Sequence, residues 1–311
     1  MGIFVTVDIG GTHIRAATFQ HNSTSPIKHR RTVTRSRDST VYDRVLASIK
    51  SVWPDTGEVK AIGVASPGPL DPQTGVILAT PNIPEWHNFP LGAKLADHFG
   101  IPVYLDNDAN LAALGEWRYG AGQGHHDVLY LTISTGIGGG VINHDHLLQG
   151  YHGLAAELGH VNVLPNGPIC SCGKPGHLEA LASGPAIVNY INEQLATGAQ
   201  SILKSHAALT AEKVAEAASD GDALAIAAYE RAGYYLGLAI SSFLHIFDPS
   251  IVILGGGVSK SGYLLFNPLN ASLHQHVFNP RYLEKLTITT AALGDDAGLL
   301  GALALTLIAG S

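Results

Sequence analysis

The sequence predicts an α/β protein with a duplicated, two-lobed fold, and three observations support this prediction. Strand-like and helix-like segments alternate along the chain, which is typical of α/β architecture. An apolar strand, a glycine turn and a second apolar strand occur twice, at 3–20 and at 128–146. The 311 residues suffice for about two domains and for a core that needs no disulfide or metal.

The composition excludes several classes of protein. Hydrophobic residues make up 46% of the chain and charged residues 14%, so the chain is not intrinsically disordered. A net charge of −7 argues against a nucleic acid or an anionic membrane as a partner bound by bulk electrostatics. The longest apolar stretch, 297–310, is shorter than the ~20 residues of a membrane span. Two cysteines form no disulfide framework and the first residues resemble no signal peptide, so we expect a cytoplasmic protein.

Turn-forming residues separate the predicted elements in the first half of the chain. The run 66–69 (Ser-Pro-Gly-Pro) ends a buried strand, because proline cannot continue a sheet. The polar run 106–108 (Asp-Asn-Asp) precedes a helix that it can cap. A basic stretch at 21–37 is assigned no element. The predicted strands cover 3–9, 14–20, 61–65 and 103–105, and the predicted helices cover 41–53, 91–99 and 109–119.

The second half begins with the repeated unit and continues mainly with helices. The repeat consists of a strand at 128–134, a glycine turn at 136–140 and a strand at 141–146. Asp248 and Pro249 end a long helix, and a strand at 251–254 then runs into three glycines. The predicted helices cover 184–195, 210–219, 223–247 and the apolar C-terminal segment 297–310.

The first glycine turn is a candidate phosphate site. Asp8 ends a strand and is followed by Gly10, Gly11 and Thr12. Backbone N–H groups at glycines can converge on an anion, and the Thr12 hydroxyl adds a donor. Asp8 could hold Mg²⁺ directly or through water. The alternative is an ordinary glycine hairpin turn, and this motif alone does not decide between the two.

Two further glycine turns also follow strands. The turn that starts at Thr135 and Gly136 is not a Walker A loop, because no Gly-Lys-Ser/Thr follows it. Gly255, Gly256 and Gly257 follow the strand at 251–254, where a purine or ribose could lie flat against the backbone. Three such turns at strand ends are harder to explain as ordinary turns than one.

Carboxylate, amide and imidazole groups form a candidate sugar site. Asp108 opens a helix after a strand, so it either caps the helix or acts as a general base toward a substrate hydroxyl. Asn107 could hold a neighbouring hydroxyl. Glu157 and His160 lie one helical turn apart, and Asn82 lies in a loop. Sets of this kind suit carbohydrates, whose hydroxyls both donate and accept hydrogen bonds.

A cysteine and histidine cluster is a candidate metal site. Cys170 and Cys172 are too close in sequence for an easy disulfide. With His177 and the upstream His160 they make a Cys₂His₂ set that suits tetrahedral Zn²⁺, and four protein ligands would make the site structural. The alternative is two unrelated thiols near two surface histidines.

Taken together and in this order, the motifs resemble the ROK family of bacterial sugar kinases and repressors. The resemblance extends from residue 3 to about residue 305. It rests on the runs at 8–12 (Asp-Ile-Gly-Gly-Thr), 67–69 (Pro-Gly-Pro), 107–110 (Asn-Asp-Ala-Asn) with Gly115-Glu116, 135–140 (Thr-Gly-Ile-Gly-Gly-Gly), 157–160 (Glu-Leu-Gly-His), and the Cys170-x-Cys172-Gly173-x-x-Gly176-His177-x-Glu179 pattern.

The resemblance implies an actin-like fold of the ASKHA, ribonuclease H-like type, with ATP and sugar in the cleft between the lobes. It divides the chain into a small domain at 1–118, joined by the C-terminal helix at 295–311, and a large domain at 119–294. The implied reaction is the Mg-ATP-dependent phosphorylation of the 6-hydroxyl of glucose, with Asp108 as base. The implied sugar ligands are Gly68, Asn82, Asn107, Asp108, Glu157, His160 and Glu179. The residues that the resemblance implies to face ATP are Asp8, Gly10, Gly11, Thr12, Thr135, Gly136, Gly255, Gly256 and Gly257.

The resemblance also implies a structural zinc ion that positions the sugar loop, because His160 in the family contacts both zinc and sugar. This chain has His177 where the family usually has a third cysteine. Histidine is a competent zinc ligand, so we expect Zn²⁺ on His160, Cys170, Cys172 and His177.

Other functions within and beyond this family stay open from sequence alone. The sugar could instead be fructose, mannose, N-acetylglucosamine or N-acetylmannosamine. A sugar-responsive repressor would carry a helix-turn-helix ahead of Asp8, but Asp8 lies too near the first residue for one. An actin-like ATPase would not need the cluster of Glu157, His160 and Glu179. The resemblance suggests a homodimer or homotetramer. We expect the protein to bind small molecules, without nucleic-acid or membrane partners.

Overall fold

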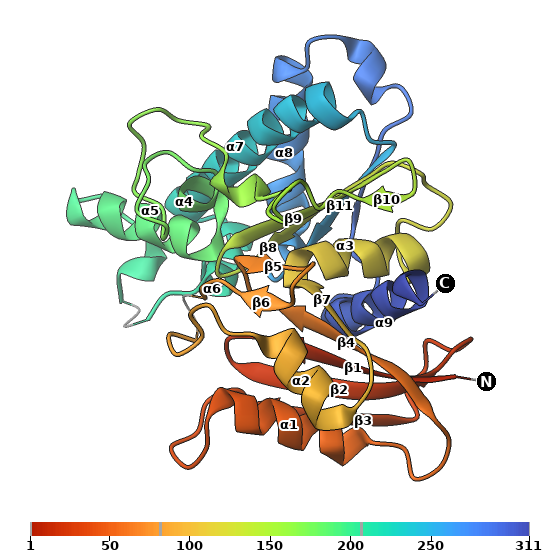
Figure 1. Ribbon diagram of the computed structural model, residues 1–311. Coiled ribbons are helices and arrows are strands. Elements are labelled where there is room, and N and C mark those ends of the chain that lie inside the picture. The colour runs from red at the N-terminus through yellow and green to blue at the C-terminus, as the bar shows by residue number, and fades with distance from the viewer. Residues whose placement is uncertain (1, 81–82, 206–207, 311) are drawn as a thin grey trace.

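The computed structural model describes residues 2–80, 83–205 and 208–310, and it contains two five-stranded sheets of the same topology (Figure 1). In each sheet, an antiparallel hairpin is extended by strands parallel to its first strand. This repetition confirms the predicted duplicated α/β fold. In spatial order, the first sheet contains β3 (Lys28–Val33), β2 (His13–Gln20), β1 (Ile3–Ile9), β4 (Val59–Ser66) and β7 (Val103–Asn107). The second sheet contains, in the same order, β10 (His146–Leu147), β9 (Ile137–Asn143), β8 (Val128–Ile133), β11 (Ile251–Gly255) and β12 (Thr287–Thr290).

Side chains of the second sheet alternate between two cores, as the period of a strand requires. Leu129 and Leu131 of β8 are buried in a core with residues of α7 (Ala223–Phe247). Tyr130, between them, points to the opposite face and packs with α3 (Asp108–Tyr119). Helices therefore cover both faces of this sheet.

The first sheet shows the same alternation. Val5 and Val7 of β1 are buried with residues of α1 (Val41–Val52), whereas Phe4 packs with α9 (Ala297–Ala309). Because α9 lies on the first sheet and α3 on the second, these two helices pack against each other between the sheets (Figure 1).

The remaining elements complete the layers. On the second sheet, the helices α4 (Glu179–Ala182), α5 (Gly184–Ala196), α6 (Ala211–Ser219) and α8 (Tyr263–His276) lie in the outer layer with α7. On the first sheet, α2 (Leu91–Phe99) packs beside β7. The small elements are the hairpin β5 (Leu70–Asp71) and β6 (Val76–Ile77) and the 3₁₀ turns η1 (Leu158–His160), η2 (Ile202–Ser205), η3 (Val258–Ser261), η4 (Pro280–Leu283) and η5 (Gly294–Asp296).

Most predicted elements are found within one or two residues of their expected limits, but the second glycine turn is shorter than predicted. β9 already begins at Ile137, so Gly138 and Gly140 belong to a strand. A Cβ atom on Gly140 would lie 2.5 Å from Cβ of Ala113, and one on Gly138 would lie 2.8 Å from Cβ of Ala109. These glycines therefore let α3 approach the sheet closely, which no other residue type would allow.

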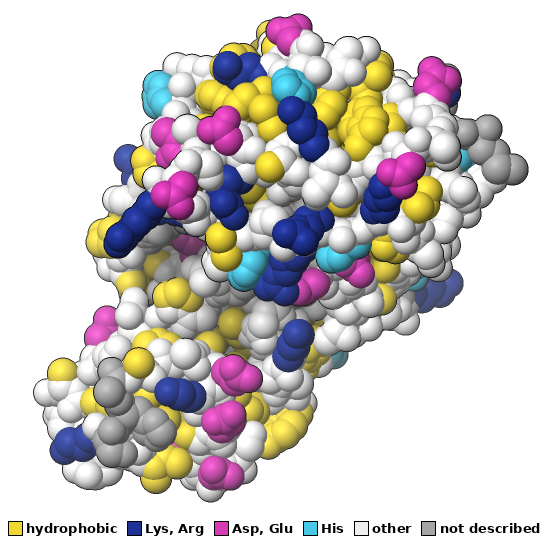
Figure 2. Space-filling model, turned by 90° about the horizontal axis from the view of Figure 1, so that it is seen from below, with side chains coloured by type: hydrophobic (Ala, Val, Ile, Leu, Met, Phe, Trp, Pro, Cys, Tyr) yellow, Lys and Arg dark blue, Asp and Glu magenta, His cyan; other side chains and the backbone are white. Residues whose placement is uncertain are grey.

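The basic stretch at 21–37, to which the sequence assigns no element, contains the edge strand β3. Lys and Arg side chains gather on the face seen from below, the side on which α1 and β3 lie (Figures 1 and 2). Arg30 and Arg31 of β3 are exposed. Charged side chains on an edge strand discourage pairing with a second molecule. Within the described part of the chain, no helix has the length and hydropathy needed to cross a bilayer.

Candidate active site

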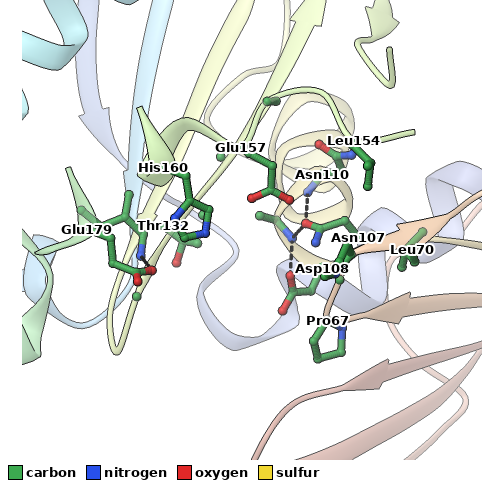
Figure 3. Close-up of a pocket in the computed structure, with 18 of the residues that line it drawn as sticks. Pro67, Leu70, Asn107, Asp108, Asn110, Thr132, Leu154, Glu157, His160 and Glu179 are labelled. Atoms are coloured by element: carbon green, nitrogen blue, oxygen red, sulfur yellow. Dashed lines mark hydrogen bonds between the residues drawn. The ribbon is translucent and has the colours of Figure 1, made fainter. Parts of the chain in front are cut away.

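The centre of the site is the junction between β7 and α3. Asn107 ends the strand and caps the helix, because its side-chain oxygen accepts hydrogen bonds from the backbone N–H groups of Ala109 (2.9 Å) and Asn110 (3.4 Å). The helix cap expected within 106–108 is therefore Asn107. Asp108, the first residue of the helix, lines the cavity, and its Oδ1 also accepts from the N–H of Ala109 at 2.9 Å (Figure 3).

A cavity of about 530 Å³ opens in front of Asp108, and residues from both sheets line it. Glu157 reaches toward Asn107 and Asp108 from the opposite wall, with His160 and Glu179 beyond it (Figure 3). The cavity thus brings together residues that are far apart in sequence. The predicted site residues that line it are Gly68, Asn107, Asp108, Thr135, Gly136, Glu157, His160, Cys172 and Glu179. Asn82 lies outside the described residues.

The electrostatics of the cavity favour a carboxylate that can take up a proton. Desolvation, followed by the negative charge of Asp8 and then that of Glu157, raises the pKa of Asp108 to about 7. Desolvation and the nearby Glu179 also raise the pKa of Glu157, against the effect of His160. A general base is most effective when its pKa lies near the working pH, so Asp108 has the property that such a base needs.

A further carboxylate, Asp8, lies near the end of β1. Burial raises its pKa to about 6, although Arg15 opposes this shift through an ion pair of 3.3 Å. Arg15 also bonds the Asp295 carboxylate at 3.1 Å. The charge of Asp8 contributes to the raised pKa of Asp108, so these two carboxylates lie near each other.

The first glycine turn is a hydrogen-bonded hairpin turn between β1 and β2. The Gly10 N–H, expected to face phosphate, donates instead to the backbone oxygen of His13 at 2.9 Å. Gly11 and Thr12 are exposed at the tip. Thr34 holds the turn, because its N–H donates to the oxygen of Thr12 and its hydroxyl to that of Gly10. The N–H of Gly10 is therefore not available to an anion in this conformation.

Glu179 connects three parts of the site. Its carboxylate accepts hydrogen bonds from the backbone N–H of Ile137 at 3.1 Å and from the Ser171 hydroxyl at 2.6 Å. A Cβ atom on Gly136 would lie 2.6 Å from this carboxylate, so a larger residue there would displace the Glu179 side chain. Glu179 thus joins the second glycine turn to the cysteine loop. Ser171 was not recognised in the sequence, since a single serine between two cysteines carries no distinctive signal.

The cysteine and histidine cluster assembles as expected. The ligand atoms of His160, Cys170, Cys172 and His177 all lie within 4.8 Å of one another. Cys170 Sγ is 3.5 Å from His160 Nδ1, and Cys172 Sγ is 3.2 Å from His177 Nδ1. Two thiols and two imidazoles at these separations fit a four-coordinate Zn²⁺ ion. His177 fills the fourth position of the set.

A second cavity, of about 720 Å³, adjoins the first at Ser134 and Thr135. It reaches from the start of α5 to η3, and Gly257 lines it. Gly255 and Gly256 do not line it in this structure: a Cβ atom on Gly255 would lie 2.5 Å from the Tyr130 hydroxyl, and one on Gly256 2.3 Å from the backbone oxygen of Ile133. Sequence reasoning also missed polar lining residues on separate helices and turns, which are Asn189, Glu212, Tyr229 and Lys260.

Comparison with known proteins decides the family. The sequence profile of the ROK family matches residues 4–308. The chain belongs to the ROK family. The resemblance noted from the motifs is therefore confirmed, and the two mixed five-stranded sheets agree with the actin-like architecture of ROK structures.

ROK proteins similar to this chain include kinases and regulators. A glucokinase of Thermotoga maritima is 39% identical, over 96% of this chain and 95% of that protein. A crystal structure of a ROK family glucokinase from Streptomyces griseus, in complex with glucose and AMPPNP, is 34% identical with a TM-score of 0.81, over 97% of this chain and 98% of that one. A xylose repressor of Caldicellulosiruptor bescii is 30% identical over 86% of this chain, but over only 67% of the repressor.

Proposed function

We propose that this ROK protein is a sugar kinase that transfers the γ-phosphoryl group of ATP to the 6-hydroxyl of glucose. The observation that carries the proposal is Asp108, a carboxylate with a pKa raised to about 7 at the wall of a cavity that adjoins a second one. A kinase needs one cavity for the acceptor and another for the nucleotide, with a base between them. The near full-length similarity to glucokinases supports the choice of substrate.

In this proposal the sugar occupies the 530 Å³ cavity. Carboxylates and amides on several walls of the cavity can each accept from or donate to a sugar hydroxyl. Glu157 and Asp108 face each other across it, which suits a ring bound between them (Figure 3). The sugar ligands proposed are Gly68, Asn82, Asn107, Asp108, Glu157, His160 and Glu179.

The phosphoryl step follows from these positions. Asp108 accepts the proton of the 6-hydroxyl as that oxygen forms a bond to the γ-phosphorus, and the bond from phosphorus to the ADP oxygen breaks. ADP leaves with the electron pair of that bond. The base must be ionised to begin this step, so the reaction requires the deprotonated form of Asp108.

The nucleotide is proposed to occupy the 720 Å³ cavity with its phosphates toward Thr135 and Gly136. Gly257 offers an open backbone surface to the adenosine, since no atom lies within 4 Å of a Cβ atom built there. Asp8 and the turn formed by Gly10, Gly11 and Thr12 lie toward the phosphates, and the Gly10 N–H could serve only after the hairpin bond opens. Bound Mg²⁺, held by Asp8 directly or through water, would neutralise phosphate charge.

The zinc site is proposed to position the sugar loop. His160 lines the sugar cavity, and its Nδ1 is the ring nitrogen nearest to Cys170. Its other ring nitrogen, Nε2, is then free to bond a sugar hydroxyl. Zn²⁺ on His160, Cys170, Cys172 and His177 would therefore fix a sugar ligand through the same side chain.

We also propose the division of the chain into domains at 1–118 with 295–311 and at 119–294. The packing of α9 against β1 and β4 of the first sheet supports the return of the C-terminal helix to the small domain. The 530 Å³ cavity then lies where the two domains meet, because Gly68 and Asp108 come from one domain and Glu157 from the other. The 720 Å³ cavity lies within the large domain.

Asp108→Asn tests the proposed base directly. The variant keeps the shape of the side chain but cannot accept the hydroxyl proton, so kcat should fall by at least about a hundredfold. Glucose binding, measured by calorimetry, should stay within a few-fold of the parent value. A variant with near-normal kcat would show that Asp108 is not the base.

The main alternative is another hexose of the same class. Ala156 lines the cavity next to Glu157, and the shape of this wall decides whether a bulky 2-substituent fits. Fructose, mannose and the two N-acetylhexosamines are therefore the competitors to test against glucose.

A further inference from the structure

Glu116 is a buried carboxylate that the phosphoryl step does not use. Its side chain is fully buried, and it lies in α3 eight positions after Asp108. The carboxylate accepts three backbone hydrogen bonds, from the N–H groups of Ala121 (2.9 Å), Ala292 (3.1 Å) and Leu293 (2.8 Å). A carboxylate can only accept, so these three donors match its chemistry fully.

The three donors come from two segments that are far apart in sequence. Residues 120–127 lead from α3 into β8, the first strand of the second sheet in chain order. Residues 291–296 lead from β12, the last strand of that sheet, to α9. Glu116 therefore ties the entry of the chain into the second sheet to its exit from that sheet.

The backbone packs closely around Glu116. A Cβ atom on Gly120 would lie 2.1 Å from the Glu116 carboxylate. One on Gly115 would lie 2.6 Å from the backbone oxygen of Ala297, and one on Gly301 would lie 1.7 Å from that of Leu111. The two helices between the sheets, α3 and α9, are thus in backbone contact, and Glu116 bonds the end of α3 to the segment that precedes α9.

We propose that Glu116 is a positioning residue for phosphoryl transfer: it fixes the junction between the two sheets, and this junction acts as the pivot of the cleft. The inference rests on the proposed kinase function. Because α3 carries Asp108 at one end and Glu116 near the other, a loosened pivot changes where the base lies relative to the nucleotide cavity. Closure of a cleft depends on a few such positions, which lie far from the chemistry.

Glu116→Gln tests the pivot with the smallest change of shape. An amide presents one oxygen and one NH₂ group, so part of the set of backbone donors loses its acceptor. We expect hydrogen exchange at the amides of 121, 292 and 293 to be at least about tenfold faster, with β8 and β11 unaffected. We expect kcat per folded enzyme to fall by about tenfold at a temperature well below unfolding, as misplacement of a distant group can cause.

Asp222→Asn is the matched control. Asp222 also accepts backbone hydrogen bonds from two segments, from Ile202 at 2.9 Å and Ala225 at 2.9 Å, but it lies at the start of α7, away from the pivot. This variant should lower the thermal midpoint and keep kcat within about twofold of the parent. If Glu116→Gln also kept its kcat, Glu116 would be a structural residue only and the proposal would be wrong.

Trp117→Phe keeps the proposal testable if Glu116→Gln does not fold. Trp117 Nε1 donates to the backbone oxygen of His125 at 2.8 Å, within the same entry segment. Loss of this bond should give a smaller fall in kcat, of about threefold, with faster exchange in 120–127. An unchanged kcat in a folded Trp117→Phe protein would contradict the proposal.

Turnover and hydrogen exchange test the kinase function and the role of Glu116 separately. If the parent protein shows no sugar-dependent ATP turnover, the kinase proposal fails and the kinetic role of Glu116 fails with it. The exchange rates at 121, 292 and 293 do not depend on turnover. Unchanged rates in Glu116→Gln would therefore show that Glu116 does not hold the two segments together, whether or not the protein is a kinase.

Discussion

Asp108 shows how position in the fold changes the chemistry of one residue. In the sequence it is one of two aspartates before a helix and could equally be a cap. In the structure Asn107 caps α3, and Asp106 is buried against Asn110 and Gln149. Asp108 alone of the run is left with a carboxylate facing the cavity, where burial raises its pKa. The division of labour among the three is a property of the junction between β7 and α3.

The raised pKa of Asp108 predicts the pH dependence of turnover. The base is active when ionised and its pKa is about 7, so kcat/KM for the sugar should rise as the pH increases through about 7 and level off above it. The measurement is a pH profile from 5.5 to roughly 8.5 at saturating Mg-ATP. A flat profile across this range would contradict the assignment of Asp108 as base.

The same shift predicts a pH-dependent effect on stability. A carboxyl with a raised native pKa binds its proton more tightly when folded, so its contribution to stability is lost as the pH rises from about 4 to about 7. Asp108→Asn removes that loss. The thermal midpoint of the variant should therefore exceed that of the parent at pH 8 by a few degrees and approach it at pH 4. An equal difference at both values of pH would mean that desolvation does not control this carboxyl.

At the scale of elements, the loop that carries Cys170 and Cys172 would join the proposed zinc site to the proposed sugar cavity. Backbone bridges between Ile169 and Pro175 and between Asn162 and His177 shape the loop, and His160 reaches from it into the sugar cavity. Removal of Zn²⁺ by a chelator should lower the thermal midpoint and raise the KM for sugar by at least about fivefold, with a smaller effect on the KM for ATP. Metal analysis of the protein as purified is the control. Equal effects on both substrates would contradict a specific link between zinc and sugar.

Contact between α3 and β9 depends on glycine. A Cβ atom on Gly140 would lie 2.5 Å from Cβ of Ala113 and 3.0 Å from the backbone oxygen of Ala109. Gly140→Ala should therefore destabilise the protein by about 1–3 kcal/mol through overpacking. Gly257→Ala is the control for stability, because a Cβ atom there meets no atom within 4 Å. Thermal unfolding of both variants measures the difference, and equal midpoints would contradict the packing argument.

At the scale of the whole molecule, the sequence predicted the architecture better than the details of the ligand sites. The duplicated unit was visible because β1, β2 and β8 are apolar runs bounded by glycine. β3 was missed because an edge strand rich in lysine and arginine lacks the alternating apolar pattern. The sequence pattern places Gly138 and Gly140 in a turn, because the close approach of α3 is a tertiary property that a local pattern does not contain.

The candidate site, too, could be predicted from the sequence only in part. The residues around Asp108 and the metal cluster could be predicted because short motifs hold them together, and the structure brings them into one region. The second cavity could not, since Asn189, Glu212 and Lys260 come from separate elements without a shared motif. Among the glycines at 255–257, only the last lines that cavity, because packing against Tyr130 and Ile133 occupies the other two.

The central claim is that the cleft phosphorylates glucose. The most direct measurement is ADP release by the purified protein with Mg-ATP, compared across glucose, fructose, mannose, N-acetylglucosamine and N-acetylmannosamine. We predict that kcat/KM for glucose exceeds that for every other sugar by at least about tenfold, and that ADP release without sugar is negligible. A preference for another sugar would contradict the substrate assignment, and the absence of any sugar-dependent ADP release, with zinc content verified, would contradict the kinase itself.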